Sequence, residues 1–171
     1  MLPKPRRWPQ LLLLLLFLST IGCDRVSKST ASELLPTRGA LSVVEGVFEL
    51  RYTENRGVAF GFLHDIDHGA LPWVLGLGAL AGTLVVVTHW WRRRRSSLVE
   101  QASYAAIAAG GAANGLDRLG DGSVVDFMHV TGWPIFNVAD VALVAGGVLL
   151  LVAHLGVRTP EPGAQSPPNS R

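Results

Sequence analysis

Hydrophobic residues gather in four long stretches of this chain, and polar residues fill the segments between them. Residues 70–91 are 22 positions without a formal charge, and residues 138–157 are 20 positions with one charge, Asp140. A helix of about 20 apolar residues crosses the roughly 30 Å hydrocarbon core of a bilayer. These two stretches are therefore predicted to be membrane-spanning helices.

Two further stretches are predicted to span the membrane on weaker hydropathy. The apolar segment from Pro9 to Cys23 has only 15 residues, so a span there has to start at Trp8 and continue to about Lys28. Between residues 98 and 116 alanine and glycine dominate, and such small residues suit close contact between helices inside a bundle. The four predicted spans lie at about residues 8–28, 70–91, 98–116 and 136–157.

The loop after the first span contains a predicted strand. Apolar and polar residues alternate strictly over residues 48–53, which is the period of a half-buried strand. Phe48, Leu50 and Tyr52 would then face lipid or the bundle. The predicted fold class is an α-helical integral membrane protein, a four-transmembrane-helix bundle with a small β element in the first outer loop. Residues 1–157 form one domain, and residues 158–171, rich in Pro, Ser and Gly, are predicted to be a disordered cytoplasmic tail.

Composition agrees with a membrane protein and excludes several other classes. Hydrophobic residues make up 49% of the 171 positions and charged residues 16%, against about 25% charged in soluble domains, and the mean hydropathy is +0.32. This excludes a disordered chain and a nucleic-acid module. The single cysteine, Cys23, excludes a disulfide scaffold, and the sequence has no metal-ligand spacing. We therefore expect no metal, no cofactor and no nucleic-acid partner.

The charged residues predict the orientation of the spans. Basic residues precede the first span, and Arg92–Arg95 follow the second. Residues 29–69 carry three basic and six acidic groups, and residues 116–133 have a net charge of −2. Because basic loops stay in the cytoplasm, both termini are predicted to be cytoplasmic and the acidic loops external.

Polar residues at the outer ends of the spans are the candidates for chemistry, since burying them costs several kcal/mol unless they are paired. They occur at helical spacings, so the members of each pair share a helix face. The pairs are Asp24 with Lys28, Asn114 with Asp117 beside Arg118, and Asn137 with Asp140.

Two carboxylates form the favoured catalytic pair. Pro134 is predicted as the first helical residue of the last span, which places Asp140 one to two turns inside the membrane boundary. Asp126 lies 14 residues earlier in an apolar setting and can fold back against it. Two such carboxylates tend to share one proton, so that one activates a water and the other polarises a carbonyl. Asp117 is the competing member, and helix capping and an ion pathway are the non-enzymatic alternatives.

The amino terminus offers an alternative from another class. The order of segments there is typical of a lipoprotein signal peptide that ends in a lipidated cysteine. Basic residues come first, then the apolar residues 11–18, then the run from Thr20 to Cys23. A small secreted lipoprotein is therefore the second hypothesis. A mature lipoprotein would have no use for three further spans, which favours Cys23 as a small residue in a helix.

Five motifs in order resemble those of lipoprotein signal peptidase (signal peptidase II), an aspartic peptidase family of the bacterial inner membrane. The match covers most of residues 20–150. The motifs are Asp-x-x-Ser-Lys at 24–28, Asn-x-Gly-x-Ala-Phe at 55–60, Asn-x-x-Asp-Arg at 114–118, Val-Val-Asp-Phe at 124–127 and Phe-Asn-x-Ala-Asp at 136–140. Ala113 stands where the family usually has glycine, and the segment 127–136 is shorter than in the family.

The resemblance implies removal of signal peptides from diacylglyceryl-modified prolipoproteins, with cleavage before the modified cysteine. Asp126 and Asp140 occupy the positions of the catalytic pair. The substrate-binding or supporting positions are Asn55, Gly57, Asn114, Asp117, Arg118, Asn137, Asp24 and Lys28. The implied partners are prolipoproteins and membrane lipid, and the enzyme is expected to be a monomer with its active site near the outer face of the membrane.

Overall fold

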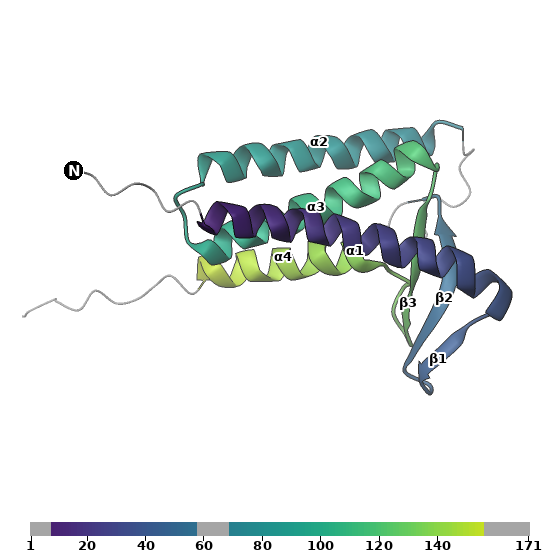
Figure 1. Cartoon of the computed structure of the whole chain (residues 1–171). Coiled ribbons are helices and arrows are strands. Elements are labelled where there is room, and N and C mark those ends of the chain that lie inside the picture. Colours follow the sequence, from purple (N-terminus) through teal and green to yellow (C-terminus); the bar gives the residue numbers. More distant parts are fainter. Residues whose placement is uncertain (1–7, 58–68, 156–171) are drawn as a thin grey trace, which may run out of the picture.

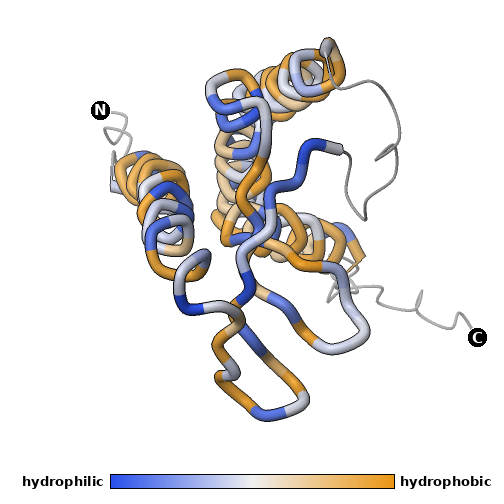
Figure 2. Tube along the Cα trace, turned by 90° about the vertical axis from the view of Figure 1, so that its right-hand side faces the viewer, coloured by the Kyte–Doolittle hydropathy of each residue, from blue (hydrophilic) through white to orange (hydrophobic). Residues whose placement is uncertain are grey.

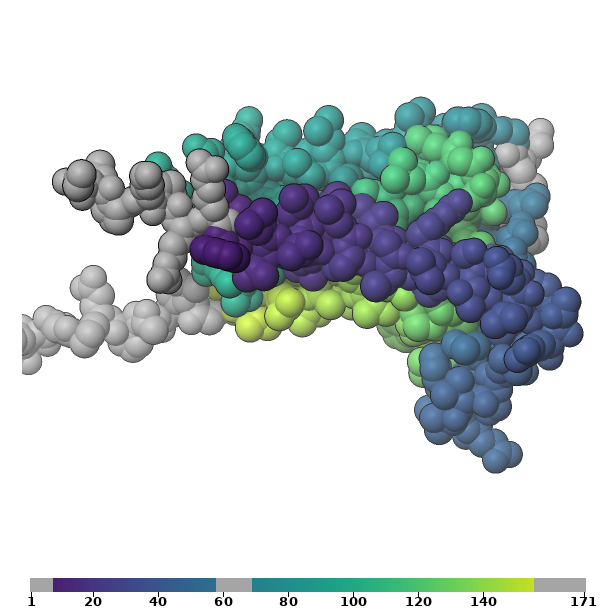
Figure 3. All heavy atoms as spheres, in the orientation of Figure 1, coloured from purple at the N-terminus to yellow at the C-terminus, as the bar shows by residue number. Residues whose placement is uncertain are grey.

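The computed structural model describes residues 8–57 and 69–155, and the predicted tail at 158–171 lies outside them. The four helices of these residues lie side by side, and three strands form a small sheet at one end of the bundle (Figure 1). Figure 3 shows the sheet projecting beyond that end. The elements are, in order, α1 (Trp8–Arg38), β1 (Leu41–Val44), β2 (Phe48–Asn55), α2 (Leu71–Arg92), α3 (Leu98–Gly120), β3 (Val124–Val130) and α4 (Val138–Leu155).

Three of the helices, α1, α2 and α4, are long and apolar enough to cross a membrane. Their large hydrophobic side chains, such as Leu15, Leu84 and Val144, face outward from the bundle. Figure 2 shows the apolar residues along the helices and the polar ones in the connections at the sheet end. This arrangement is that of a multi-pass membrane protein, in which lipid takes the place of a protein core on the outside.

The remaining helix, α3, is the central one and contacts each of the other three. It is the least hydropathic span of the prediction, and the structure gives the reason. Eleven of its residues are buried, mostly alanine and glycine. Because its surroundings are other helices rather than lipid, small residues that allow close approach replace bulky apolar ones.

Glycines mark the closest helix contacts. A Cβ on Gly110 of α3 would overlap the Ala139 carbonyl oxygen and stand 2.8 Å from Leu143 Cγ on α4. A Cβ on Gly146 of α4 would stand 2.9 Å from the Ser103 carbonyl oxygen on α3. The two helices therefore approach through a glycine on each side, one of which lies against the first turn of α4.

The first helix is ten residues longer than the predicted span at 8–28. Asp24, Lys28, Ala31 and Leu35 are its buried residues at the sheet end, spaced along one face. Ala31 and Leu35 pack against Phe127 of β3, so the extension covers the sheet. The helix ends where Gly39 takes a positive φ of 74°.

The predicted strand at 48–53 is present as part of β2, and its apolar residues Leu50 and Tyr52 pack toward the extension of α1. Strands β1 and β3 flank it in the antiparallel order β1-β2-β3. The sequence analysis did not predict these two strands. In the register of β2 with β3, Thr53 pairs with Asp126 and Asn55 with Val124.

The prediction that Pro134 is the first helical residue of the last span was wrong. Phe136 and Met128 exchange two backbone hydrogen bonds of 2.9 Å, so Phe136 continues the pairing of β3. Pro134 lies in the connection, and the helix starts at Val138. Asp140 is therefore in the first turn of α4.

We expect Gly110→Ala to destabilise the bundle, since the added methyl group forces α3 away from α4. Overpacking of this kind costs about 1–3 kcal/mol. Thermal unfolding of the purified protein in detergent measures the effect. Gly147→Ala is the matched control, because nothing lies within 4 Å of a Cβ at that helical glycine. Equal melting temperatures for the two variants would contradict the close approach.

Candidate active site

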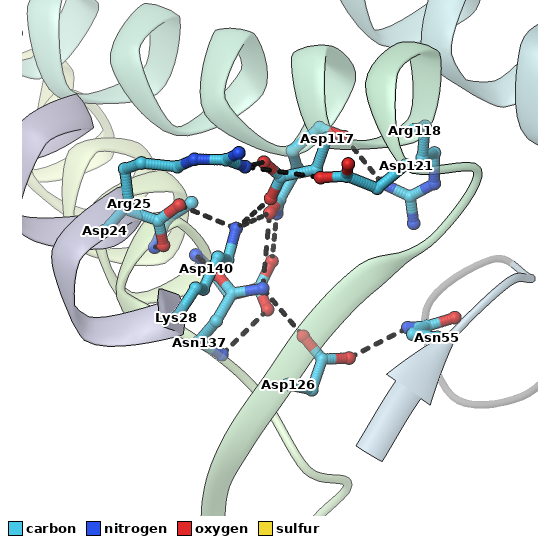
Figure 4. A network of polar contacts seen from close by, with 12 residues as sticks. Asp24, Arg25, Lys28, Asn55, Asp117, Arg118, Asp121, Asp126, Asn137 and Asp140 are labelled. Atoms are coloured by element: carbon cyan, nitrogen blue, oxygen red, sulfur yellow. Dashed lines mark hydrogen bonds and ion pairs between the residues drawn. The ribbon is translucent and has the colours of Figure 1, made fainter. Parts of the chain in front are cut away.

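A buried lysine joins two helices at the sheet end of the bundle. The side chain of Lys28 on α1 is 3% exposed, and its ammonium contacts Asp24 Oδ2 and Asp117 Oδ2 at 2.6 Å each and Asn114 Oδ1 at 2.9 Å (Figure 4). An ammonium has three hydrogens to donate, and the three acceptors use them. We call these four residues the Lys28 cluster.

The Lys28 cluster also holds the start of α4. Asp24 Oδ1 accepts a hydrogen bond of 2.8 Å from the Ala139 amide. That amide belongs to the first turn of α4, where backbone N–H groups have no partner within the helix. Ala139 is fully buried, with Gly110 against its carbonyl group. The first turn of α4 is thus fixed between α1 and α3.

Asn137 and Asp140 cap α4 reciprocally. The Asp140 amide donates to Asn137 Oδ1 at 3.0 Å, and the Asn137 amide donates to Asp140 Oδ2 at 3.2 Å. This is the geometry of a capping box, with residues three apart satisfying each other's backbone groups. The i, i+3 spacing of Asn137 and Asp140 therefore caps the helix, and the same hydrogen bonds hold the Asp140 carboxylate in place.

Asn137 links the two candidate catalytic carboxylates. Its Nδ2 donates to Asp126 Oδ1 at 2.6 Å, while its backbone and side chain hold Asp140. Asn55 Nδ2 on β2 donates to the other Asp126 oxygen at 3.0 Å, and Asn114 Nδ2 donates to Asp140 Oδ1 at 2.8 Å. Each carboxylate is thus held by asparagine side chains from different elements (Figure 4).

Asp117 lies elsewhere in the network. Its two oxygens accept from Lys28 at 2.6 Å and from Arg25 at 3.2 Å, and Arg25 also contacts Asp121 at 3.3 Å. Both oxygens of the Asp117 carboxylate are thus bound to cations. The geometry therefore puts Asp117 in a supporting place beside the two other carboxylates.

Arg118 connects α3 with the residues after β2. Its Nη2 donates to the Gly57 carbonyl oxygen at 3.1 Å, and its Nη1 to the Asn114 carbonyl oxygen at 3.3 Å. Gly57 in turn donates its amide to Asn55 Oδ1 at 3.1 Å. Arg118 thus fixes the backbone beside Asn55, the side chain that holds Asp126. Residues 58–60 of the predicted substrate loop lie outside the described residues.

Burial raises the pKa of Asp126 above that of an ordinary aspartate. Loss of solvation raises its pKa to about 6, and the charge of Asp140 acts in the same direction. The hydrogen bonds from Asn55 and Asn137 oppose the shift, because they favour the ionised form. Asp126 is therefore a group that carries a proton at mildly acidic pH, where an exposed aspartate has lost it.

Both carboxylates open into one cavity of about 540 Å³, which we call the front cavity. Six polar side chains line it, and apolar side chains, mainly from α4 and the connection before it, form the rest of the wall. The polar residues are Asn55, Asn114, Arg118, Asp126, Asn137 and Asp140, and the apolar ones are Val124, Trp133, Pro134, Ile135, Phe136, Val141, Leu143, Val144 and Ala145. Such a cavity suits a substrate with a large apolar part and one reacting polar bond.

All eight supporting residues and both candidate carboxylates of the prediction meet at this end of the bundle. Sequence reasoning missed Arg25, whose contacts lie more than 90 positions away along the chain, and the apolar wall at 133–135. The run Trp-Pro-Ile-Phe directly before Asn137 was the available signal for that wall. No group of three side chains suited to a metal ion occurs in the described parts of the chain.

Comparisons with known proteins agree on one family. Residues 16–156 match the family model described as signal peptidase (SPase) II. The lipoprotein signal peptidase of Syntrophomonas wolfei is 36% identical over 139 residues, which cover 81% of this chain and 89% of that protein. The lipoprotein signal peptidase of an Azoarcus species is 34% identical over 161 residues, covering 90% and 89%.

The fold has solved counterparts as well. A bacterial membrane enzyme structure at 2.3 Å resolution superposes with a TM-score of 0.70 at 21% identity, covering 91% of this chain and 94% of that one. A second bacterial membrane enzyme structure, at 1.9 Å, gives a TM-score of 0.68 at 23% identity, covering 84% and 92%.

We expect Lys28→Met to destabilise the protein far more than Arg25→Ala, although both remove a cation from Asp117. Lys28→Met leaves the buried Asp24 carboxylate without a cation and Asp117 with only the exposed Arg25, at a cost of about 3–5 kcal/mol. The side chain of Arg25 is 66% exposed, and an exposed ion pair contributes about 0–1 kcal/mol. Unfolding in denaturing detergent compares the two variants. Similar losses would contradict the role of the Lys28 cluster.

Proposed function

The chain belongs to the signal peptidase II family, and from this premise we propose that it is a membrane-embedded aspartic endopeptidase of the bacterial cytoplasmic membrane. It removes signal peptides from prolipoproteins, as its relatives' name of lipoprotein signal peptidase states of them. The bond cleaved lies before the diacylglyceryl-modified cysteine. The observation that carries the aspartic mechanism is the pair Asp126 and Asp140, joined through Asn137 in one largely apolar cavity.

The surroundings of the two carboxylates support different roles for them. Asp140 lies in the first turn of α4, where it accepts hydrogen bonds from the Asn137 amide and from Asn114 Nδ2. Asp126 is buried on a strand, and burial keeps its proton up to about pH 6, the pKa that it acquires there. We assign Asp140 as the general base and Asp126 as the general acid. Environments that separate two carboxyl groups in this way set acid and base roles.

Hydrolysis then proceeds with one water for each peptide bond. Asp140 takes a proton from the water, whose oxygen attacks the carbonyl carbon before the modified cysteine, and protonated Asp126 polarises the carbonyl oxygen. The tetrahedral intermediate collapses as the C–N bond breaks, and the proton held by Asp140 passes to the new amino group. Asp126, which gave its proton to the carbonyl oxygen when the intermediate formed, takes a proton back from a hydroxyl group of the intermediate as the C–N bond breaks. The products are a carboxylic acid, an amine and the starting pair.

Substrate binding divides between the two parts of the front cavity. The wall of α4 and residues 133–136 faces the apolar part of the lipid-modified precursor, which stays in contact with the bilayer. Asn55, together with the Gly57 backbone held by Arg118, lies beside Asp126 and is suited to bind the extended peptide at the scissile bond. All of these groups come from one chain, which supports a monomeric enzyme.

Topology supports cleavage on the outer side of the membrane. The α2–α3 connection with Arg92–Arg95 lies at the end of the bundle opposite the sheet (Figure 1). Basic residues favour the cytoplasmic side, so the sheet and the two carboxylates face outward with both termini inside. We also propose that α3 crosses the membrane as a fourth span, shielded by its neighbours.

Features of the structure disfavour the alternatives. Helix α1 continues past Cys23 for 15 residues and places Asp24 and Lys28 in the buried network, so cleavage at Cys23 would detach the membrane anchor of that network. An ion pathway needs charged groups through the depth of the membrane. In the described helices the acidic side chains lie toward the ends of the bundle, with none between Glu100 and Asp117 on α3.

We expect Asp126→Asn and Asp140→Asn each to lower cleavage of a diacylglyceryl-modified prolipoprotein by about 10²–10⁴-fold, the contribution of a general acid or base. The melting temperature should change little compared with the loss of activity. Asp121→Asn, an exposed acid at the same end of the bundle, is the control that should retain activity. Full activity in both dyad variants would refute the assignment.

The assigned roles also predict the pH dependence. Activity needs Asp126 protonated, so kcat/KM should fall as the pH rises through its pKa of about 6. The Asn55 hydrogen bond favours the ionised form, so Asn55→Ala should raise that pKa and move the alkaline limb to higher pH. Glu54→Gln, an exposed neighbour on the same strand, should leave the limb in place. A limb that moves to lower pH in Asn55→Ala would contradict the acid role of Asp126.

A further inference from the structure

A second cavity of about 230 Å³ lies on the other face of β3. The strand separates it from the front cavity, because successive residues of a strand point to opposite faces. Val124 and Asp126 line the front cavity, whereas Ser123 and Val125 line the second one. We call this space the back cavity.

The two cavities differ in chemistry. Seven of the eight side chains that line the back cavity are polar or charged, including Ser29, Ser32, Lys28 and Asp117. Its volume is room for roughly seven water molecules at about 30 Å³ each, and hydroxyl and charged groups supply the partners that buried water needs. By contrast, the front cavity is mostly apolar, which suits lipid rather than water.

The back cavity reaches solvent at one end and the catalytic network at the other. Arg25 and Asp121 at its rim have side chains that are 66% and 62% exposed. At its inner end Lys28 lies 2.9 Å from Asn114 Oδ1, and Asn114 Nδ2 lies 2.8 Å from Asp140 Oδ1. One side chain, Asn114, therefore separates the lining of the back cavity from the proposed general base.

Hydrolysis also requires a route for water to the carboxylates. Each turnover consumes one water, yet the substrate's lipid and signal peptide would fill the apolar space in front of the carboxylates. We propose that the back cavity is the water port of the enzyme, which supplies the nucleophilic water to Asp140 past Asn114 while the substrate occupies the front cavity. This inference rests on the proposed peptidase function and adds the route by which water, the second substrate, reaches the carboxylates.

Blocking the port from the side of α1 tests it. The only cysteine is replaced first, as Cys23→Ser, and Ser32→Cys then places a thiol in the lining of the back cavity. The probe is a small, charged, water-soluble methanethiosulfonate that forms a disulfide with the thiol. Thr30→Cys is the matched control: it is exposed on the same helix, and both hydroxyl groups donate to the carbonyl oxygen four residues earlier at 2.9 Å.

We expect the adduct at residue 32 to lower kcat at least tenfold with KM for the prolipoprotein unchanged, and the adduct at residue 30 to have no such effect. Reduction of the disulfide should restore activity. The alkaline limb of the pH profile and the melting temperature should stay in place, since the adduct removes water and leaves the dyad intact. A shift in either would instead indicate a disturbed Lys28 cluster and would overturn the port.

Labelling with the front cavity occupied gives a readout that does not depend on turnover. In Ser32→Cys combined with Asp126→Asn, bound uncleaved prolipoprotein should leave the labelling rate within about twofold of its value without substrate. Loss of labelling on binding, or full activity of the adduct, would overturn the port. A Cys23→Ser parent that binds prolipoprotein but does not cleave it would instead refute the proposed function, and the role of the port with it.

Discussion

The site depends on one buried positive charge. A lysine ammonium is costly to remove from water, and Lys28 is stable in the bundle because two carboxylates and an amide oxygen surround it. Each of these acceptors has a second contact: Asp24 holds the first turn of α4, Asn114 holds Asp140, and Asp117 holds Arg25. The contacts that compensate the charge of Lys28 thereby hold α1, α3 and α4 in place relative to each other. An apolar substitute could fill the space but could not bind three partners at set positions.

The same network gives the neighbouring carboxyl groups of Asp126 and Asp140 different surroundings. Asp140 accepts hydrogen bonds from the Asn137 amide and the Asn114 side chain at the start of α4. Asp126 lies on β3, where burial removes it from water. Asn137 contacts both, so any displacement of one carboxylate is transmitted to the other. Helix capping and the arrangement of the proposed catalytic pair are therefore one structural feature, since Asn137 takes part in both.

The sequence predicted the helices and the polar pairs on their faces, since charge-free stretches and i, i+3 or i, i+4 spacings are local signals. It predicted that Asp24 and Lys28 share a face, and the structure shows them paired. It could not predict that Lys28 binds Asn114 and Asp117, nor that Arg25 reaches Asp117, because these contacts join helices far apart in the chain. Strand β3 was missed because its apolar run has no alternation to mark it, and the start of α4 was misplaced because the pairing of Phe136 with Met128 overrides the helix signal of Pro134.

Successive side chains of β3 point to opposite faces of the strand, and this limits where the length of the chain can vary in evolution. Inserting or deleting one residue just before Asp126 would exchange the two faces of the strand and turn the carboxylate away from the front cavity. The turn at 131–132, where Gly132 has a φ of 81°, lies beyond the carboxylate and has no such constraint. Length changes between these aspartates should therefore accumulate in the turn.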